Sequence, residues 1–318
     1  MTEHFTRPDV AMFLEFLNAL PGPKTHELPP AMARAMYVAS KDAADLPVGE
    51  LAVVRDLSAP GPAGAIPLRL FDSRADRPAG PVLVFYHGGG FVIGDLDTHA
   101  GICAEMARQL DLPVVAVDYR LAPEHPFPAA PDDCEAATRW IAGSPAELGL
   151  SVTGLVLSGD SAGGNLTVVT AMALRDSAAA VPVIAQFPIY PTVDHAQGYA
   201  SYELFGEGRL LTKEGMTWFD QCYAPIADDW RSAALHASHH DMPPTLVITA
   251  GLDPLRDQGR AYAAALIAEG VPTVYREATG NIHGFVTLRK AIPSAQAEVD
   301  GALAVLKGII AEAMAAQA

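Results

Sequence analysis

The sequence predicts an α/β protein with a mostly parallel central sheet flanked by helices. Its apolar runs are short and continuous rather than alternating, and each is bounded by Gly, Pro or Asp, as in strands buried on both faces of a parallel sheet. The stretches between these runs are long enough for crossover helices. The runs are 82–86, 114–119, 155–158, 183–189, 245–250 and 273–276. The helical stretches between them are 99–110, 132–142, 164–175 and 259–269.

Two segments lie outside this alternation. Apolar residues at spacings of three and four predict an opening helix at 8–20, and a second helix is predicted at 31–40. One face of the first helix is predicted to consist of Phe13, Phe16, Leu17 and Leu20. The interval 192–244 separates two predicted strands. Because a structureless loop of that length is improbable, we expect it to form helices that cover one end of the sheet.

The composition limits the class of protein. The chain has 318 residues, of which 50% are hydrophobic and 18% charged, so a large core is available and a disordered chain is excluded. With 21 Lys and Arg against 37 Asp and Glu, the net charge is −16, which would repel nucleic acid. Three widely spaced cysteines, no leader pattern and no long apolar run predict a cytoplasmic protein without disulfides or membrane insertion.

The most informative motif follows a predicted strand and precedes a predicted helix. Gly159-Asp160-Ser161-Ala162-Gly163 matches the pattern G-x-S-x-G. In that setting the serine lies on a sharp, strained turn that presents its hydroxyl, and small flanking residues allow the turn to pack closely. We therefore predict that Ser161 is a nucleophile rather than part of a glycine-rich turn without chemistry.

A second glycine-rich turn, Gly88-Gly89-Gly90, follows another predicted strand. Without side chains, the backbone of Gly88 and Gly89 can approach a reacting oxygen and form an oxyanion hole together with the N–H of Ala162. The alternative is a dinucleotide-binding fingerprint, but its third glycine should stand at position 93 and comes one residue later. We therefore favour the oxyanion hole over a nucleotide site.

A serine nucleophile needs a base, and the base needs a carboxylate that orients it. His283 follows the predicted last strand, and its loop can return it to the carboxyl edge of the sheet. Asp253 stands just past the strand 245–250 and is the candidate carboxylate. Asp257, four residues later, is the rival candidate and otherwise a local cap or salt-bridge partner.

A metal site is the alternative use of other histidines in this part of the chain. His236, His239 and His240 are close in sequence, and Asp241 adds a carboxylate. We expect a solvated approach to the next strand instead, with no metal bound.

In their order along the chain, these motifs resemble the bacterial hormone-sensitive lipase family, or family IV, of carboxylesterases in the α/β-hydrolase superfamily. The sequence order Ser161, Asp253, His283 is that of the α/β-hydrolase fold, and the resemblance covers most of the chain. The matching segments are His87-Gly88-Gly89-Gly90, the stretch Y-R-L-A-P-E-H-P-F-P-A-A at 119–130, the G-D-S-A-G-G elbow at 159–164, D-P-L-R-D at 253–257 and H-G-F at 283–285.

The resemblance implies the hydrolysis of short- to medium-chain acyl esters through an acyl-serine intermediate. Ser161 would be the nucleophile, His283 the general base and then the acid, and Asp253 its partner. The implied oxyanion donors are Gly88, Gly89 and Ala162. No cofactor is implied, and the expected partners are a small-molecule ester and, as an alternative to a monomer, a second copy in a homodimer.

The resemblance also implies a division of the chain into two parts. A discontinuous helical cap would comprise residues 1–45 and 194–235. The α/β-hydrolase catalytic domain would comprise residues 46–193 and 236–318.

Two other functions remain open at this point. The same triad could act on lactones or amides or transfer acyl groups, because the motifs describe acyl chemistry and not the leaving group. A non-catalytic ligand receptor on the same fold, like the plant gibberellin receptors, is the other alternative. The presence of His283 argues against the receptor.

Overall fold

The structure of the protein is a computed structural model that describes residues 4–195 and 198–317. Residues 1–3 and 196–197 of the expected cap and residue 318 of the expected catalytic domain lie outside this part. The strands are β1 (Val53–Gly61), β2 (Gly64–Asp72), β3 (Gly80–Tyr86), β4 (Val114–Val117), β5 (Val152–Asp160), β6 (Val183–Ile189), β7 (Thr245–Ala250) and β8 (Thr273–Ala278). The helices are α1 (Pro8–Ala19), α2 (Pro30–Ala44), α3 (Ala100–Leu110), α4 (Ala129–Ala142), α5 (Ala162–Asp176), α6 (Ala200–Phe205), α7 (Lys213–Tyr223), α8 (Arg256–Ala268) and α9 (Ser294–Gln317), and the short 3₁₀ helices are η1 (Thr25–Glu27), η2 (Ala234–His236) and η3 (Phe285–Thr287).

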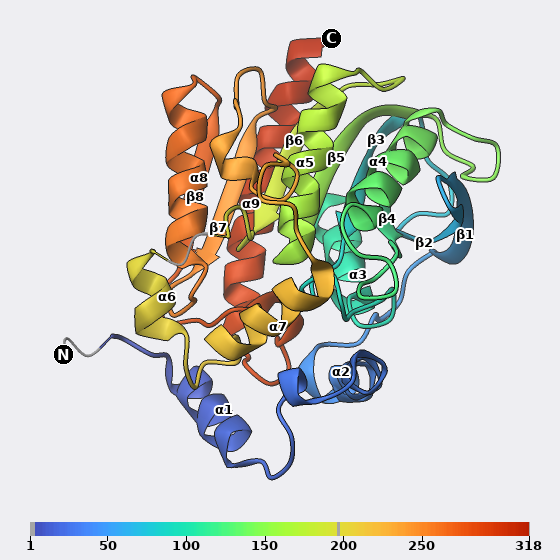
Figure 1. The fold of residues 1–318 in the computed structure, drawn as a ribbon. Coiled ribbons are helices and arrows are strands. Elements are labelled where there is room, and N and C mark those ends of the chain that lie inside the picture. The colour runs from blue at the N-terminus through green and yellow to red at the C-terminus, as the bar shows by residue number, and fades with distance from the viewer. Residues whose placement is uncertain (1–3, 196–197, 318) are drawn as a thin grey trace.

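The strands form one sheet in the order β1-β2-β4-β3-β5-β6-β7-β8 (Figure 1). Neighbours from β4 to β8 are parallel, whereas β1 pairs with β2 and β2 with β4 in antiparallel fashion. The predicted α/β class with a mostly parallel sheet is therefore confirmed. Every predicted apolar run coincides with a strand from β3 to β8, although the run 114–119 extends two residues past β4, and the β1–β2 hairpin was not predicted.

Both faces of the sheet are buried, and β3 shows why its sequence is continuously apolar. Val82 and Val84 pack into one core with α4, α5 and α8, whereas Leu83 and Phe85 pack into the other core with α3 and α9. Each successive side chain in the strand therefore meets a helix layer, and no position is left for a polar residue.

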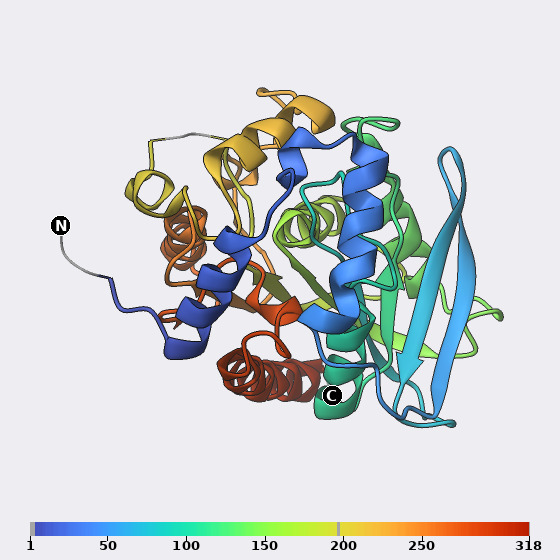
Figure 2. The same cartoon turned by 90° about the horizontal axis from the view of Figure 1, so that it is seen from below.

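Helices α1, α2, α6 and α7 gather at the end of the sheet where the parallel strands end (Figures 1 and 2). The Arg34 guanidinium of α2 donates to the carbonyl oxygens of Val92 and Ala122, both at 2.7 Å, in the segments that follow β3 and β4. Tyr223 of α7 stacks on Phe91 with ring centroids 3.8 Å apart. The prediction that 192–244 contains helices over one end of the sheet is thus confirmed.

The opening helix forms as predicted, but its predicted apolar face is only partly buried: Phe13 and Leu17 are half-buried. Val10 and Leu14 are the buried residues of α1, whereas Phe16 and Leu20 are 63% and 51% exposed. Polar contacts fix the rotation of the helix, because Asp9 accepts hydrogen bonds from the backbone N–H of Ser294 at 2.7 Å and from its hydroxyl at 3.0 Å.

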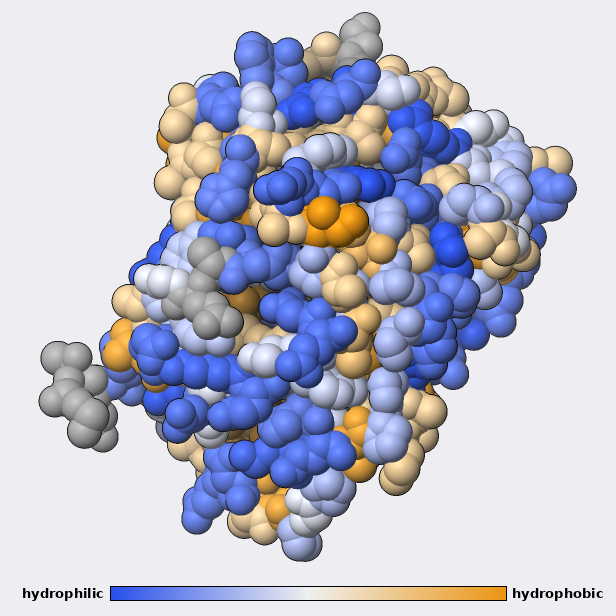
Figure 3. All heavy atoms as spheres, in the orientation of Figure 1, coloured by the Kyte–Doolittle hydropathy of each residue, from blue (hydrophilic) through white to orange (hydrophobic). Residues whose placement is uncertain are grey.

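The surface agrees with the acidic composition. The face in Figure 3 is mostly hydrophilic, and strongly apolar residues form small separate patches. Among the residues that the structure describes, no helix is both long enough and apolar enough to cross a bilayer.

Candidate active site

The turn between β5 and α5 consists of a single residue, Ser161. Its φ is 57°, in the left-handed region that side chains other than glycine rarely adopt. Its N–H donates to the carbonyl oxygen of Ile189 at 2.9 Å, and its own carbonyl accepts the N–H of Asn165 at 3.1 Å. The neighbouring strand and the helix therefore hold the strained turn in place from both sides.

Glycines allow this turn to pack directly against the end of β3. A Cβ added to Gly163 would lie 1.9 Å from the carbonyl oxygen of Tyr86, and one added to Gly159 would lie 2.5 Å from the same oxygen. Both distances are far below van der Waals contact. The G-x-S-x-G pattern is therefore a steric requirement of the approach between β5, α5 and β3.

We expect Gly163→Ala to lower the free energy of unfolding by about 2–3 kcal/mol, because the added methyl overlaps the Tyr86 carbonyl. The matched control is Gly308→Ala in α9, where an added Cβ meets no atom within 4 Å. Alanine is the better helix former, so the control should raise the same free energy by about 0.5–1 kcal/mol. Urea denaturation measures both values, and equal effects of the two variants would contradict the steric argument.

The structure brings three predicted side chains together in a chain of hydrogen bonds. Nε2 of His283 lies 2.9 Å from Oγ of Ser161, and Nδ1 of His283 lies 2.7 Å from Oδ2 of Asp253. Asp253 is fully buried, and its Oδ1 accepts the N–H of Leu255 at 2.8 Å. Because an ionised carboxylate only accepts, Nδ1 carries the imidazole proton and Nε2 can accept the serine proton.

The rival carboxylate has other partners. Oδ2 of Asp257 accepts the N–H of Ser201 at 2.9 Å, and Oδ1 forms ion pairs with Arg256 and Arg260. Asp257 thus connects α6 to α8, in agreement with the alternative prediction that it is a salt-bridge partner.

The candidate metal ligands have different partners. His236 faces Asp194, His240 pairs with Asp241 at the surface, and His239 is buried with its ring edge-on to Tyr262. Within residues 4–195 and 198–317, no three His, Cys, Asp or Glu side chains are grouped so that they could hold a metal ion.

The glycine-rich turn requires a correction of the predicted oxyanion donors. The N–H of Gly88 donates to Oδ1 of Asp160 at 2.8 Å, so it is not available to a substrate. The N–H groups of Gly89 and Gly90 donate no hydrogen bond within the described part of the chain. The N–H of Ala162, the first residue of α5, is also free of an intrahelical acceptor. Gly90 was missed, although it is the third glycine of the same run.

His87 holds this turn from behind. Its Nδ1 lies 2.8 Å from the carbonyl oxygen of Gly88, and its ring stacks on Tyr119 with centroids 4.3 Å apart. Burial, together with the nearby His99, lowers the pKa of His87 to about 4. The ring is therefore neutral near neutral pH and donates from Nδ1, as expected for a residue that pins the backbone.

The comparisons with known proteins agree with this geometry. A family described as the alpha/beta hydrolase fold matches residues 83–287, which contain the glycine-rich turn, the serine turn and the histidine. The chain belongs to the α/β-hydrolase family. Its relatives place it in the hormone-sensitive lipase branch, as the motifs predicted.

Relatives of this hydrolase include named esterases. Over 249 residues it is 43% identical to the carboxylic ester hydrolase LipN of Mycobacterium tuberculosis, covering 74% of this chain and 65% of LipN. It is 38% identical over 268 residues to the esterase LipI of the same organism, covering 82% and 83%. It is 34% identical over 302 residues to the ethyl acetate hydrolase of Pseudomonas putida, covering 91% and 94%.

Solved structures extend the likeness to nearly the whole chain. A mutant of LAE6, an α/β hydrolase enzyme from the metagenome of Lake Arreo, has a TM-score of 0.89 and 37% identity, covering 96% of this chain and 98% of that one. A thermostable esterase from Pseudomonas putida has a TM-score of 0.90 and 29% identity, covering 98% and 99%.

Side chains from the 192–244 segment of the hydrolase reach both loops of the site. A Cβ added to Gly90 would lie 2.3 Å from the ring of Phe219 in α7, so this ring lies directly on the glycine-rich turn. A Cβ added to Gly284 would lie 3.4 Å from a methyl carbon of Leu210. The two apolar side chains therefore lie close to the glycine-rich turn and to the residue that follows His283.

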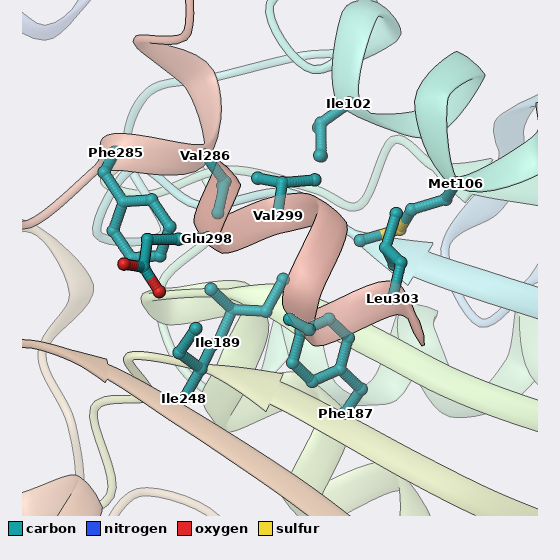
Figure 4. A pocket seen from close by; sticks show the side chains of 11 residues that line it. Ile102, Met106, Phe187, Ile189, Ile248, Phe285, Val286, Glu298, Val299 and Leu303 are labelled. Atoms are coloured by element: carbon teal, nitrogen blue, oxygen red, sulfur yellow. The ribbon is translucent and has the colours of Figure 1, made fainter. Parts of the chain in front are cut away.

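An apolar cavity elsewhere in the hydrolase does not belong to this site. It lies between α3, α9 and the sheet, and Figure 4 shows the side chains around it. Its lining includes Ile102, Phe187, Ile248, Phe285 and Leu303. None of the three hydrogen-bonded side chains faces it, so the cavity is a packing feature of the core.

Proposed function

We propose that this hydrolase cleaves carboxylic esters with short- to medium-chain acyl groups through an acyl-serine at Ser161. The observation that carries the proposal is the uninterrupted hydrogen-bond chain from Ser161 through His283 to Asp253. A hydroxyl becomes a competent nucleophile when a positioned base takes its proton, and this chain supplies the base and its orienting carboxylate.

In the proposed reaction, Oγ of Ser161 attacks the ester carbonyl while Nε2 of His283 takes the hydroxyl proton. The tetrahedral intermediate collapses when His283 gives that proton to the leaving alkoxide, which departs as the alcohol. His283 then takes a proton from water, and the resulting hydroxide equivalent attacks the acyl-serine. A second collapse returns the proton to Ser161 and releases the carboxylic acid. Asp253 stabilises the imidazolium during each transfer.

Negative charge develops on the substrate oxygen in both tetrahedral intermediates and needs preorganised donors. The proposed donors are the N–H groups of Gly89, Gly90 and Ala162. Gly90 takes the place of Gly88 in this set, because the N–H of Gly88 already donates to Asp160.

The proposed cap comprises residues 1–45 and 194–235, and it supports the preference for small acyl groups. Its residues Phe219 and Leu210 lie close to Gly90 and Gly284, in the loops that carry the proposed oxyanion donors and His283, and we expect them to limit the length of the acyl chain. A relative named ethyl acetate hydrolase is also 34% identical over 302 residues. A cytoplasmic location is part of the proposal and is supported by three cysteines that form no disulfide with one another.

A p-nitrophenyl ester series from acetate through hexanoate to palmitate tests the acyl preference. We expect kcat/KM to be highest at or below hexanoate and at least about tenfold lower for palmitate, because Phe219 and Leu210 would limit the length of the acyl chain. Amide and lactone analogues of the best acyl group should react more slowly than the ester. A preference for palmitate would contradict the proposed acyl range, and a preference for the lactone or the amide would contradict the leaving-group assignment.

A further inference from the structure

Asp160, the last residue of β5, is a buried carboxylate that the proposed reaction does not use. It is 4% exposed and directly precedes Ser161 in the chain. Its Oδ1 accepts the N–H of Gly88 at 2.8 Å and lies 3.2 Å from Nε2 of His99, and its Oδ2 accepts the hydroxyl of Tyr190 at 3.3 Å. One carboxylate thus binds the glycine-rich turn, the residue before α3 and the residue after β6.

The carboxylate is ionised near neutral pH despite its burial. Burial by itself would raise its pKa, but the His99 ring, the Gly88 N–H and the charge of His283 together hold the pKa below its usual value. A charge inside a protein is costly unless it is paired and hydrogen-bonded. The partners of Asp160 meet that condition at the centre of the site.

Tyr190 extends this network to the proposed base. Its ring lies against the His283 ring with centroids 4.6 Å apart, and it is fully buried. Its φ is 31°, an unfavourable value for a tyrosine, so the surrounding structure must hold it in this conformation. Tyr190 therefore keeps one face of the imidazole in contact with a residue that donates to Asp160.

We propose that Asp160 is a positioning residue that fixes the glycine-rich turn through Gly88 and supports the protonated form of His283 through its charge and Tyr190. This inference rests on the proposed function. Asp160 fixes the peptide before Gly88, while His87 holds the carbonyl of Gly88. In a planar trans peptide, the carbonyl of Gly88 and the N–H of Gly89 point in opposite directions. Fixing the carbonyl therefore also fixes the direction of the Gly89 N–H, one of the proposed oxyanion donors.

The charge of Asp160 also acts on the proton transfer to His283. When Ser161 attacks, His283 becomes an imidazolium, and a nearby negative charge in a poorly solvated site stabilises it. Asp253 contacts His283 directly, whereas Asp160 is connected to it through Tyr190, which donates to Asp160 and lies against the His283 ring. Several other titratable groups interact with Asp160. They are Tyr37 of α2, His87 of the glycine-rich turn, His99 just before α3, Cys103 in α3, Tyr119 after β4, and Tyr190 after β6.

The test measures the rate at which a fluorophosphonate labels Ser161, from about pH 5 to pH 9, together with the thermal unfolding midpoint. Asp160→Asn keeps the shape and a hydrogen-bond acceptor but removes the charge. Tyr190→Phe removes the hydroxyl and keeps the ring against His283. Asp72→Asn is the matched control, because Asp72 is a buried carboxylate paired with Arg77 away from the site.

We expect Asp160→Asn to label about 10- to 100-fold more slowly, less than the loss of a direct oxyanion donor. The acidic limb of its plot of labelling rate against pH should move to lower pH, because the His283 imidazolium loses a stabilising negative charge and its pKa falls. Tyr190→Phe should label about 2- to 10-fold more slowly, since it removes one hydrogen bond. Asp72→Asn should label at the wild-type rate even if its unfolding midpoint falls.

The proposal is overturned if Asp160→Asn labels within about twofold of the wild type, or if its slow labelling comes with an unmoved acidic limb, as a merely structural role would give. If Asp160→Asn does not fold, Tyr190→Phe decides, and labelling at the wild-type rate overturns the proposal. Ester turnover is measured separately. A wild-type protein that labels but hydrolyses no ester refutes the proposed function alone, whereas one that does not label refutes both.

Discussion

Ser161→Ala is expected to lower kcat on p-nitrophenyl acetate by about 10⁶-fold, because it removes the oxygen that attacks the ester. Ser161 alone occupies the turn between β5 and α5, and Nε2 of His283 lies 2.9 Å from its Oγ. The hydroxyl is the group that would form the covalent bond to the substrate, so its removal abolishes the acyl-serine route. The measurement is steady-state turnover by the purified variant, with circular dichroism to verify the fold.

The matched control is Ser158→Ala, three residues earlier, in β5. The Ser158 hydroxyl is buried and donates to the carbonyl oxygen of Phe187 at 2.9 Å, so its loss costs a hydrogen bond and leaves the site intact. This variant should keep kcat within about twofold and lose about 1 kcal/mol of stability. Wild-type turnover by Ser161→Ala would falsify the assignment of the nucleophile.

The parallel part of the sheet could be predicted because burial on both faces produces a recognisable pattern of apolar residues in the sequence. In β3, β5 and β7 nearly every side chain packs against a helix, so the apolar runs are continuous and their ends are sharp. The hairpin of β1 and β2 has no such continuous apolar pattern. Most residues of β1 are at least partly exposed at the edge of the sheet, and polar residues such as Arg55 and Asp56 interrupt any apolar pattern.

The same reasoning separates the predictable from the unpredictable parts of the site. Ser161, Asp253 and His283 each stand just after a strand, so strand prediction brings all three to one edge of the sheet. The partner of the Gly88 N–H could not be found in this way. It is a side chain 72 residues later, and only the closeness of β3 and β5 makes it the acceptor.

The Asp253→Asn variant is expected to lower kcat by about 10⁴-fold through the wrong imidazole tautomer. The N–H of Leu255 donates to Oδ1 of Asp253, so the amide oxygen of the variant stays there and its NH₂ group faces Nδ1 of His283. Nδ1 must then accept, the imidazole proton moves to Nε2, and Ser161 loses its proton acceptor.

The Asp257→Asn variant is the control for this step, because the two carboxylates are close in sequence and differ in their partners. Asp257 accepts the N–H of Ser201 and pairs with Arg256, so its loss should weaken the contact between α6 and α8 and lower kcat by less than about tenfold. Both variants are compared in kcat and in unfolding midpoint. A larger loss of kcat in Asp257→Asn than in Asp253→Asn would reverse the assignment of the carboxylate. That result would mean that the hydrogen bond between His283 and Asp253 at 2.7 Å has no part in the reaction, and that the imidazole rotates away from Asp253 in the active enzyme.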